Sequence, residues 1–338
     1  MPDKAELREI SHGIFMITEK GAFGGFKPDV NIFVLAGSDG LVYDAGYGTK
    51  RSVKNFIARF REIERICASR GEPFSVKRIL ISHAHPDHFS GLARMRRELG
   101  LSVIVTERMA GHIGSRETYR QHYAMGDAGT GLVKLPAHRD LFFRALSPLL
   151  SFLYERLYGM AFVPDPDVII EENATIAING EPWQIFLSPG HSDDHISLYS
   201  PSRGVLFSGD NILDSIITWL GPPRSDLGRY IESLERYLTL PLTTVLGAHG
   251  EPVQNPKERI RFLLTWRAKR TEDLLSAVRG AGLRGVTVPE IAAALYENGS
   301  WLRRWFAQGW ILVTLAHLIG TGAVKREPVA GEIRLFAS

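Results

Sequence analysis

The chain is 338 residues long, with 44% hydrophobic and 23% charged residues, which allows one large globular domain or a large and a small one. The net charge is +3, from 40 basic and 37 acidic residues, so charge is weak evidence for a nucleic-acid or membrane partner. A single cysteine, Cys67, excludes an internal disulfide and a zinc site built from cysteines. Because the first residues contain no apolar signal segment, we expect a soluble, cytoplasmic protein.

The N-terminal part of the chain predicts alternating strands and helices. Strands are expected at residues 12–18, 30–36, 41–44, 76–82 and 101–106. Helices are expected around residues 53–69, where apolar residues recur at helical spacing, and from residue 88 to 97. This alternation is typical of an α/β layered core.

Residues 107–165 interrupt this alternation and form a predicted helical insertion. Its apolar stretch, residues 141–162, is about long enough to cross a membrane. Three charged side chains in the stretch are expensive in lipid, and Pro148 interrupts the helical pattern. We therefore expect an amphipathic helix that is broken near Pro148, and no transmembrane segment.

Strands resume after the insertion, at residues 168–170, 175–178, 183–187, 205–208 and 243–247, with a helix at 226–240. The pattern then changes to helices at residues 259–279, 287–296 and 301–319, followed by a short hairpin. Helices followed by a hairpin are the order of a winged-helix-like module. We therefore expect a large domain of residues 1–258 and a small C-terminal domain of residues 259–338.

Four metal-ligand side chains stand within the hexapeptide His83-Ala-His-Pro-Asp-His88, directly after a predicted buried strand. Imidazole nitrogens and carboxylate oxygens are ligands that zinc and similar divalent cations accept. His83 and His85 alternate on extended backbone, so both point the same way and could chelate one ion. Asp87 and His88 follow a proline that helps to end the strand, and could turn towards a second ion.

Three further candidates, His191, Asp210 and His249, stand just past other predicted strands. In an α/β layered fold the strand ends converge on one rim, so residues far apart in the sequence can meet there. This common placement indicates one site built from four segments. His195, close to His191, is either a hydrogen-bond partner or a loop residue.

These motifs together resemble the metallo-β-lactamase superfamily, over residues from about 8 to 260. The matching segments are Tyr43-Asp-Ala-Gly46, His83-Ala-His-Pro-Asp-His88, Pro189-Gly-His191, Ser208-Gly-Asp210 and Gly247-Ala-His-Gly-Glu-Pro252. The resemblance implies an α/β fold, the four-layer αβ/βα sandwich, with a two-metal site at its rim. The small C-terminal domain also resembles a winged-helix-like module, and the apolar residues of the insertion at 107–165 suggest a helical lid.

The resemblance also implies the role of each candidate. One ion would be held by His83, His85 and His191, and a second by Asp87, His88 and His249, with Asp210 bridging both. Asp44 matches a position that orients the first histidines, as ligand imidazoles usually need, although a simple turn residue is the alternative. Zinc is the expected metal for both ions, and iron or manganese stay open.

The presence of both Asp87 and His88 resembles glyoxalase II and its relatives. Some zinc β-lactamases have a cysteine metal ligand at the position that Asp210 occupies here. The aspartate at this position disfavours β-lactamase activity. Two bound ions would supply a bridging hydroxide at neutral pH, which Asp87 could aim, so Asp87 and Asp210 are the expected catalytic residues. The pattern therefore predicts a metal-dependent hydrolase.

Three classes of function fit such a site. The first is an acyl hydrolase for a thioester, ester or lactone with a hydrophobic part, because apolar residues between Phe142 and Phe162 could form a lid. That segment could instead pack on the core or on the second subunit of a homodimer. An endoribonuclease or other phosphodiesterase is disfavoured, because the apolar helix at 301–319 offers only the cationic pair Arg303 and Arg304. The third class is a catalytically silent ligand-binding regulator, against which the intact ligand set argues.

Overall fold

The computed structural model describes residues 5–22, 27–123, 132, 137–296 and 301–338. For residues 137–145, 147 and 301–306 it describes the backbone and not the side chains. The predicted lid residues Phe142 and Phe143, and the cationic pair Arg303 and Arg304, therefore lie outside the described side chains.

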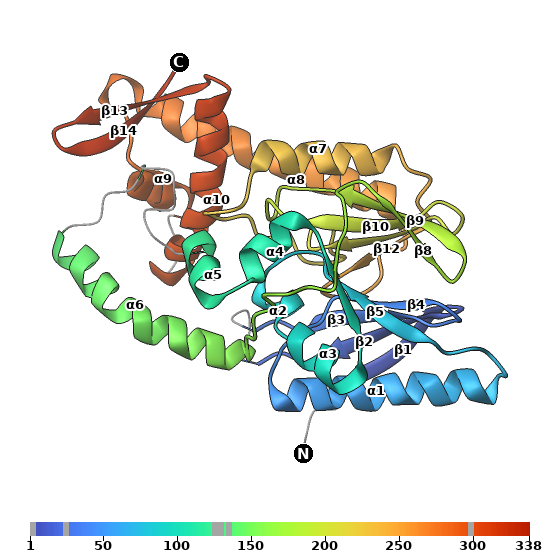
Figure 1. Ribbon diagram of the computed structural model, residues 1–338. Helices are drawn as coiled ribbons and strands as arrows, with labels where there is room; N and C mark the ends of the chain where they lie inside the picture. The colour runs from blue at the N-terminus through green and yellow to red at the C-terminus, as the bar shows by residue number, and fades with distance from the viewer. Residues whose placement is uncertain (1–4, 23–26, 124–131, 133–136, 297–300) are drawn as a thin grey trace.

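Two β-sheets face each other at the centre of the molecule (Figure 1). The first has the order β1 (Glu6–Ser11), β2 (Ile14–Glu19), β3 (Val30–Leu35), β4 (Gly40–Tyr43), β5 (Val76–Leu80), β6 (Ser102–Val105) and β7 (Val168–Ile169). Strands β1 to β4 pair antiparallel and β4 to β7 pair parallel. In the register, Tyr43 of β4 lies opposite Leu80 of β5, so the carboxyl ends of both strands reach the same edge.

The second sheet has the order β12 (Thr244–Gly247), β11 (Val205–Gly209), β10 (Ile196–Ser200), β9 (Glu181–Leu187) and β8 (Thr175–Ile178). Its β11 and β12 run parallel, with Gly209 opposite Gly247, so these two strands also end side by side. The inner faces of the two sheets are joined by aromatic contacts, such as Phe33 against Phe207 with ring centroids 4.9 Å apart.

Helices cover the outer face of each sheet (Figure 1). Next to the first sheet lie α1 (Lys50–Ser69) and α3 (Leu92–Leu99), and next to the second lie α7 (Leu227–Leu238) and α8 (Pro256–Gly280). Helix α1 begins after Thr49, whose side chain accepts a hydrogen bond from the amide of Ser52, and buries the apolar stripe from Val53 to Cys67. The predicted four-layer αβ/βα sandwich is confirmed.

The predicted insertion contains α4 (Glu107–Ile113), α5 (Arg116–Tyr123) and α6 (Ala137–Tyr158). The predicted break near Pro148 is wrong, because α6 is one helix with the proline inside it. Pro148 is exposed, so its ring has room, and the helix loses one hydrogen bond without ending. Within the described part of the chain, no helix has the length and apolar character that a membrane span requires.

The predicted strand at residues 12–18 is wrong at its start. The backbone turns at Gly13, which has a φ of +75°, and this turn joins β1 to β2. Strand β1 was not predicted from the sequence. Its side chains are largely exposed or half-buried, so its sequence lacks the apolar run of an interior strand.

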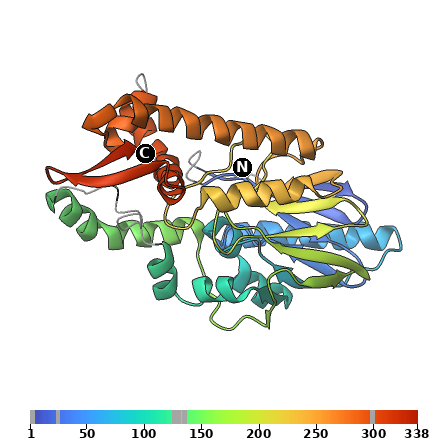
Figure 2. The same cartoon turned by 90° about the horizontal axis from the view of Figure 1, so that it is seen from above.

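The C-terminal part consists of the end of α8, η2 (Gly282–Arg284), α9 (Val288–Leu295), α10 (Trp301–Gly320) and the antiparallel hairpin β13 (Val324–Val329) and β14 (Glu332–Ala337). Figure 2 shows these elements at one end of the molecule, joined to the sandwich by α8. They share a hydrophobic cluster that includes Leu274, Ile291 and Leu335. The predicted helices and hairpin are present, and the winged-helix likeness stays a prediction. The boundary after residue 258 also stays a prediction, and α8 runs across it.

Candidate metal centre

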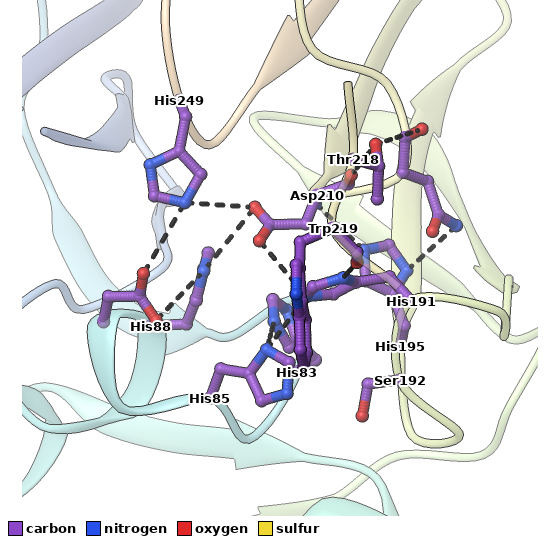
Figure 3. A network of polar contacts seen from close by, with 12 residues as sticks. His83, His85, His88, His191, Ser192, His195, Asp210, Thr218, Trp219 and His249 are labelled. Carbon is purple, nitrogen blue, oxygen red and sulfur yellow. Dashed lines mark hydrogen bonds and ion pairs between the residues drawn. The ribbon is translucent and has the colours of Figure 1, made fainter. Parts of the chain in front are cut away.

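The predicted ligand residues meet at the edge where strands of both sheets end (Figure 3). The hexapeptide follows β5, and its second half begins the short helix α2 (Pro86–Phe89). His191 lies in the turn after β9, Asp210 directly follows β11, and His249 comes two residues after β12. All seven side chains fall into two groups in which the ligand atoms lie within 4.8 Å of one another.

The first group contains His83, His85, His191 and Asp210. Nδ1 of His85 lies 2.9 Å from Nε2 of His83 and 2.8 Å from Nε2 of His191. Nε2 of His191 lies 3.2 Å from Oδ2 of Asp210. Three ring nitrogens and one carboxylate oxygen thus converge on one point, which is a donor set that a single zinc-like cation accepts.

The second group contains Asp87, His88 and His249. Nε2 of His88 and Nε2 of His249 each lie 3.6 Å from an oxygen of Asp87. The same two nitrogens lie 3.6 Å and 3.3 Å from Oδ1 of Asp210. Asp210 therefore faces the first group with Oδ2 and the second group with Oδ1.

Two buried atoms at the junction of the groups show that this donor set fits cations. Among the described residues, neither Nε2 of His88 nor Oδ1 of Asp210 has a hydrogen-bond partner. Buried polar atoms are costly without a partner, and both atoms are types that coordinate divalent metals. The residues present therefore fit two divalent ions, one in each group.

The two groups differ in electrostatics. Burial, followed by the neighbouring imidazoles, lowers the pKa of His83 well below its usual value and that of His85 to about 3. Burial also opposes protonation of His88 and His249, but the carboxylates around them outweigh it. The pKa of His88 rises to about 10, mainly through Asp44, and that of His249 to about 9, mainly through Asp210.

Asp44 supports the ligands from outside the two groups. It is fully buried, and its carboxylate accepts hydrogen bonds from the amide and the hydroxyl of Ser82 at 2.7 and 3.1 Å. The same carboxylate lies 3.1 Å from Nδ1 of His88. Ser82 Oγ in turn lies 2.9 Å from Nδ1 of His83, so Asp44 contacts one predicted ligand directly and another through Ser82.

Several supporting contacts carried little or no signal in the sequence. Nδ1 of His191 donates to the carbonyl of Trp219 at 2.8 Å, and Nδ1 of His249 donates to the carbonyl of Asp29. Backbone carbonyls exist at every residue, so sequence alone gives no reason to choose these two. His195, left open above, is a hydrogen-bond partner: its Nε2 accepts from the amide of Asp210 at 3.2 Å.

A third group of His112, Asp193 and Asp194 lies beside the first. Its carboxylates already have protein partners. Asp194 accepts from the amide of Ala84 at 2.9 Å and from the hydroxyl of Ser192, and Asp193 pairs with Arg224 at 2.8 Å. These bonds join the hexapeptide to the loop that carries His191, so the third group supports the ligand loops.

The model of the metallo-β-lactamase superfamily matches residues 27–249 of the chain. The chain is 25% identical over 156 residues to a β-lactamase-like protein 2 homologue of Caenorhabditis elegans, covering 46% of this chain and 51% of that protein. It is 28% identical over 195 residues to an atrochrysone carboxyl ACP thioesterase of Pseudocercospora fijiensis, covering 54% of this chain and 56% of that protein. The chain thus spans about half the length of these curated relatives.

A crystal structure of a β-lactamase domain protein from Burkholderia ambifaria has the same fold. Its TM-score is 0.74 at 23% sequence identity, and the match covers 100% of this chain and 97% of that one. The overall fold of the chain is therefore one that a solved structure shares. Because the family model spans more than half of the sequence and the fold agrees, this chain belongs to the metallo-β-lactamase superfamily of metal-dependent hydrolases.

Proposed function

We propose that the protein is a binuclear metal-dependent hydrolase that cleaves an acyl bond, in a thioester, ester or lactone with a hydrophobic part. The observation that carries the proposal is the position of Asp210 between the two groups. One of its oxygens lies 3.2 Å from His191, and the other lies 3.3 Å from His249. A carboxylate shared in this way can bridge two metal ions, and a pair of ions is one means of activating water for hydrolysis.

In this proposal, His83, His85 and His191 hold one ion, Asp87, His88 and His249 hold the other, and Asp210 bridges them. Zinc is the expected metal. When bound, the two ions would supply water of lowered pKa and an electrophile for the acyl oxygen. Asp87 is partly exposed at the rim, with 14% of its side chain accessible, so it can accept a hydrogen bond from the attacking water and orient it.

The reaction adds the oxygen of water to the acyl carbon and breaks the bond from that carbon to sulfur or oxygen. The departing thiol or alcohol takes one proton of the water. No serine or cysteine nucleophile is needed. Asp210 occupies the position of the cysteine ligand of β-lactamases, so β-lactams are disfavoured as substrates. The likeness to an ACP thioesterase supports an acyl thioester as the first substrate to test.

The exposed side chains of helix α6 are the evidence that the substrate has a hydrophobic part. About half of the surface of each of five side chains is exposed there: Leu149, Leu150, Phe152, Leu153 and Tyr154. The end of α6 is held by the loop before α1, because the amide of Gly48 donates to the carbonyl of Tyr158 at 2.9 Å, and burial, and then the carboxylate of Asp87, raises the pKa of Tyr158. We infer that the exposed face of α6 contacts the apolar part of the substrate.

The test is hydrolysis by metal-loaded protein of acyl thioesters of short and long chain, esters, lactones and RNA. We expect turnover of acyl substrates and a lower KM for long chains than for short ones. Leu153→Ser should raise the KM for long chains alone, and Leu283→Ser, at the fully exposed Leu283, is the matched control. Turnover of RNA alone would contradict the acyl proposal, and binding without turnover would favour a regulator. A change from dimer to monomer in Leu153→Ser, with an unchanged KM, would assign α6 to a homodimer contact.

A further inference from the structure

Two consecutive residues of the loop between β11 and α7 contact both sides of the first ligand group (Figure 3). The hydroxyl of Thr218 donates to the carbonyl of Asp210 at 2.7 Å, with the carbonyl of Asn211 at 3.2 Å as a second acceptor. The carbonyl of Trp219 accepts from Nδ1 of His191 at 2.8 Å. The Thr218–Trp219 segment therefore touches the backbone of the bridging carboxylate and the ring of a predicted ligand.

The contact with Trp219 determines which nitrogen of His191 carries hydrogen. A carbonyl can only accept, so Nδ1 is the protonated nitrogen and Nε2 keeps its lone pair. That Nε2 is the atom that faces His85 and Asp210 in the first group. A displacement of the Trp219 carbonyl would release the ring of His191, and ligand rings depend on such partners for orientation.

Helix α8 holds this loop from the other side. A guanidinium N–H of Arg267 donates to the carbonyl of Thr218. Arg259, two turns earlier on α8, donates to the carbonyls of Leu213 and Ile216, both at 2.7 Å. Two arginines of one helix thus bind three carbonyls of the loop that carries the Thr218–Trp219 segment.

Arg267 is an unusual residue at its position. It is 4% exposed, and its guanidinium lies 5.3 Å from the centre of the Tyr230 ring. Among the described residues, the groups that act on the charge of Arg267 are Tyr230 and Arg270 and include no carboxylate, and its Nε has no hydrogen-bond partner. Burying a guanidinium without a carboxylate costs free energy. The hydrogen bond from Arg267 to the carbonyl of Thr218 therefore indicates that Arg267 has a specific role in holding this loop.

The ring of Trp219 is about half exposed, and its covered side contacts two glycines. A Cβ placed on Gly221 would come within 2.1 Å of that ring, and one on Gly309 of α10 would lie 3.5 Å from it. The indole therefore lies on the backbone of Gly221 and beside α10. Elements from the C-terminal part of the chain, α8 and α10, thus restrain both residues of the segment.

We infer that Arg267 is a positioning residue of the metal centre. It fixes the Thr218–Trp219 segment, so that Thr218 holds the backbone of Asp210 and the Trp219 carbonyl orients His191. The helix that leads into the C-terminal part of the chain is by this inference also a support of the metal site. The inference rests on the proposed function, because it requires that the first group binds a metal ion.

The test compares Arg267→Met and Thr218→Val with the wild-type protein. Zinc affinity is measured by competition with a chromogenic chelator, and the geometry of the first group by the visible spectrum of the cobalt-loaded protein. We expect both variants to bind one of the two ions about 10- to 100-fold more weakly and to shift the cobalt spectrum. Arg267→Lys, which keeps a donor and the charge, should restore part of the affinity.

Two control variants on α8 separate positioning from general loss of stability. Arg261→Met changes an exposed arginine of the same helix and should leave both readouts unchanged. Leu274→Ala removes a fully buried side chain of the C-terminal cluster, so it should lower the unfolding temperature while keeping metal affinity. Equal metal loss in Leu274→Ala and Arg267→Met would overturn the inference.

The remaining outcomes are also decisive. Wild-type affinity and an unchanged spectrum in Arg267→Met would overturn the inference and leave the proposed function intact. If Arg267→Met fails to fold, Arg267→Lys decides, because it keeps the buried charge but not the planar guanidinium that reaches the Thr218 carbonyl, and wild-type affinity and spectrum in Arg267→Lys would overturn the inference. A wild-type protein that binds no metal contradicts the proposed function, and this result is seen before any variant is compared.

Discussion

The two ligand groups share Asp210, but the pKa values of two histidines in each group are shifted in opposite directions. In the first group, His83 and His85 are neutral, because burial and neighbouring imidazoles lower their pKa values. In the second, His88 and His249 are protonated, with pKa values of about 10 and 9. The difference comes from the carboxylates, since Asp87 belongs to the second group and Asp44 lies beside it.

This difference determines whether a metal ion must displace protons from the histidines when it binds. An imidazole binds a metal only when it is neutral, so a protonated histidine must first lose its proton. His83 and His85 can bind a cation at pH 7 without losing a proton, whereas His88 and His249 must each release one. We therefore expect the binding affinities of the two ions to depend differently on pH, although their ligands are similar.

The largest effect is expected from Asp210→Ala, because Asp210 is the contact that the groups share. Both ions should be lost or weakly held, and kcat should fall by at least about 10³-fold, since several kcal/mol of transition-state stabilisation depend on them. Elemental analysis and kcat with a thioester substrate measure the two effects. Asp214→Ala, a carboxylate of the following loop outside both groups, is the control. Retention of two ions by Asp210→Ala would contradict the bridging position.

Much of this site could be predicted because its ligands share one rule of position. The hexapeptide, His191, Asp210 and His249 each follow a strand, and the strands end at one edge. The rule is tied to the fold, so a sequence that predicts alternating strands and helices also predicts where their polar ends meet.

The supports of the site could not be predicted in the same way. The carbonyls of Trp219 and Asp29 contact ligand rings, yet a backbone carbonyl leaves no mark in the sequence. The role of Arg267 depends on α8 lying against a loop almost fifty residues earlier in the chain, which is a tertiary contact. The rule that proline ends a helix also failed in α6. Pro148 predicted a break, but the helix continues through this exposed proline.

Replacing one histidine of each group tests whether the groups are separate sites. His85→Ala should lose the ion of the first group and His249→Ala that of the second, so each variant should hold about one ion. We expect kcat to fall by about 10²- to 10³-fold in either case, less than in Asp210→Ala, because one cation remains. Metal titration followed by elemental analysis gives the counts, with the exposed His12→Ala as control. Loss of both ions from each variant would show one cooperative site.

Proton release measures the electrostatic difference directly. Below pH 9 both His88 and His249 carry protons, so binding to the second group should release about two protons. The affinity of that ion should then rise about 100-fold per pH unit up to pH 9, and about tenfold between pH 9 and 10. His83 and His85 release none at neutral pH. Calorimetry in buffers of different ionisation enthalpy counts the protons for each ion. Equal release by both ions would remove the distinction between the groups.

Asp44→Asn should change metal binding least of these variants. It tests most directly whether carboxylates outside the ligand set cause the difference between the two groups. Asparagine tolerates the left-handed backbone at this position, where φ is +67°, so the turn should be preserved. Loss of the carboxylate lowers the pKa of His88, because Asp44 is the main group that raises it. The second ion should then release about one proton instead of two, and its affinity should fall about 10- to 100-fold, since the ring of His88 loses its orienting acceptor. The exposed Asp39→Asn provides the control. If Asp44→Asn still released two protons, Asp87 and Asp210 alone would have to account for the charge on His88, and the contrast between the groups would lie within the ligands themselves.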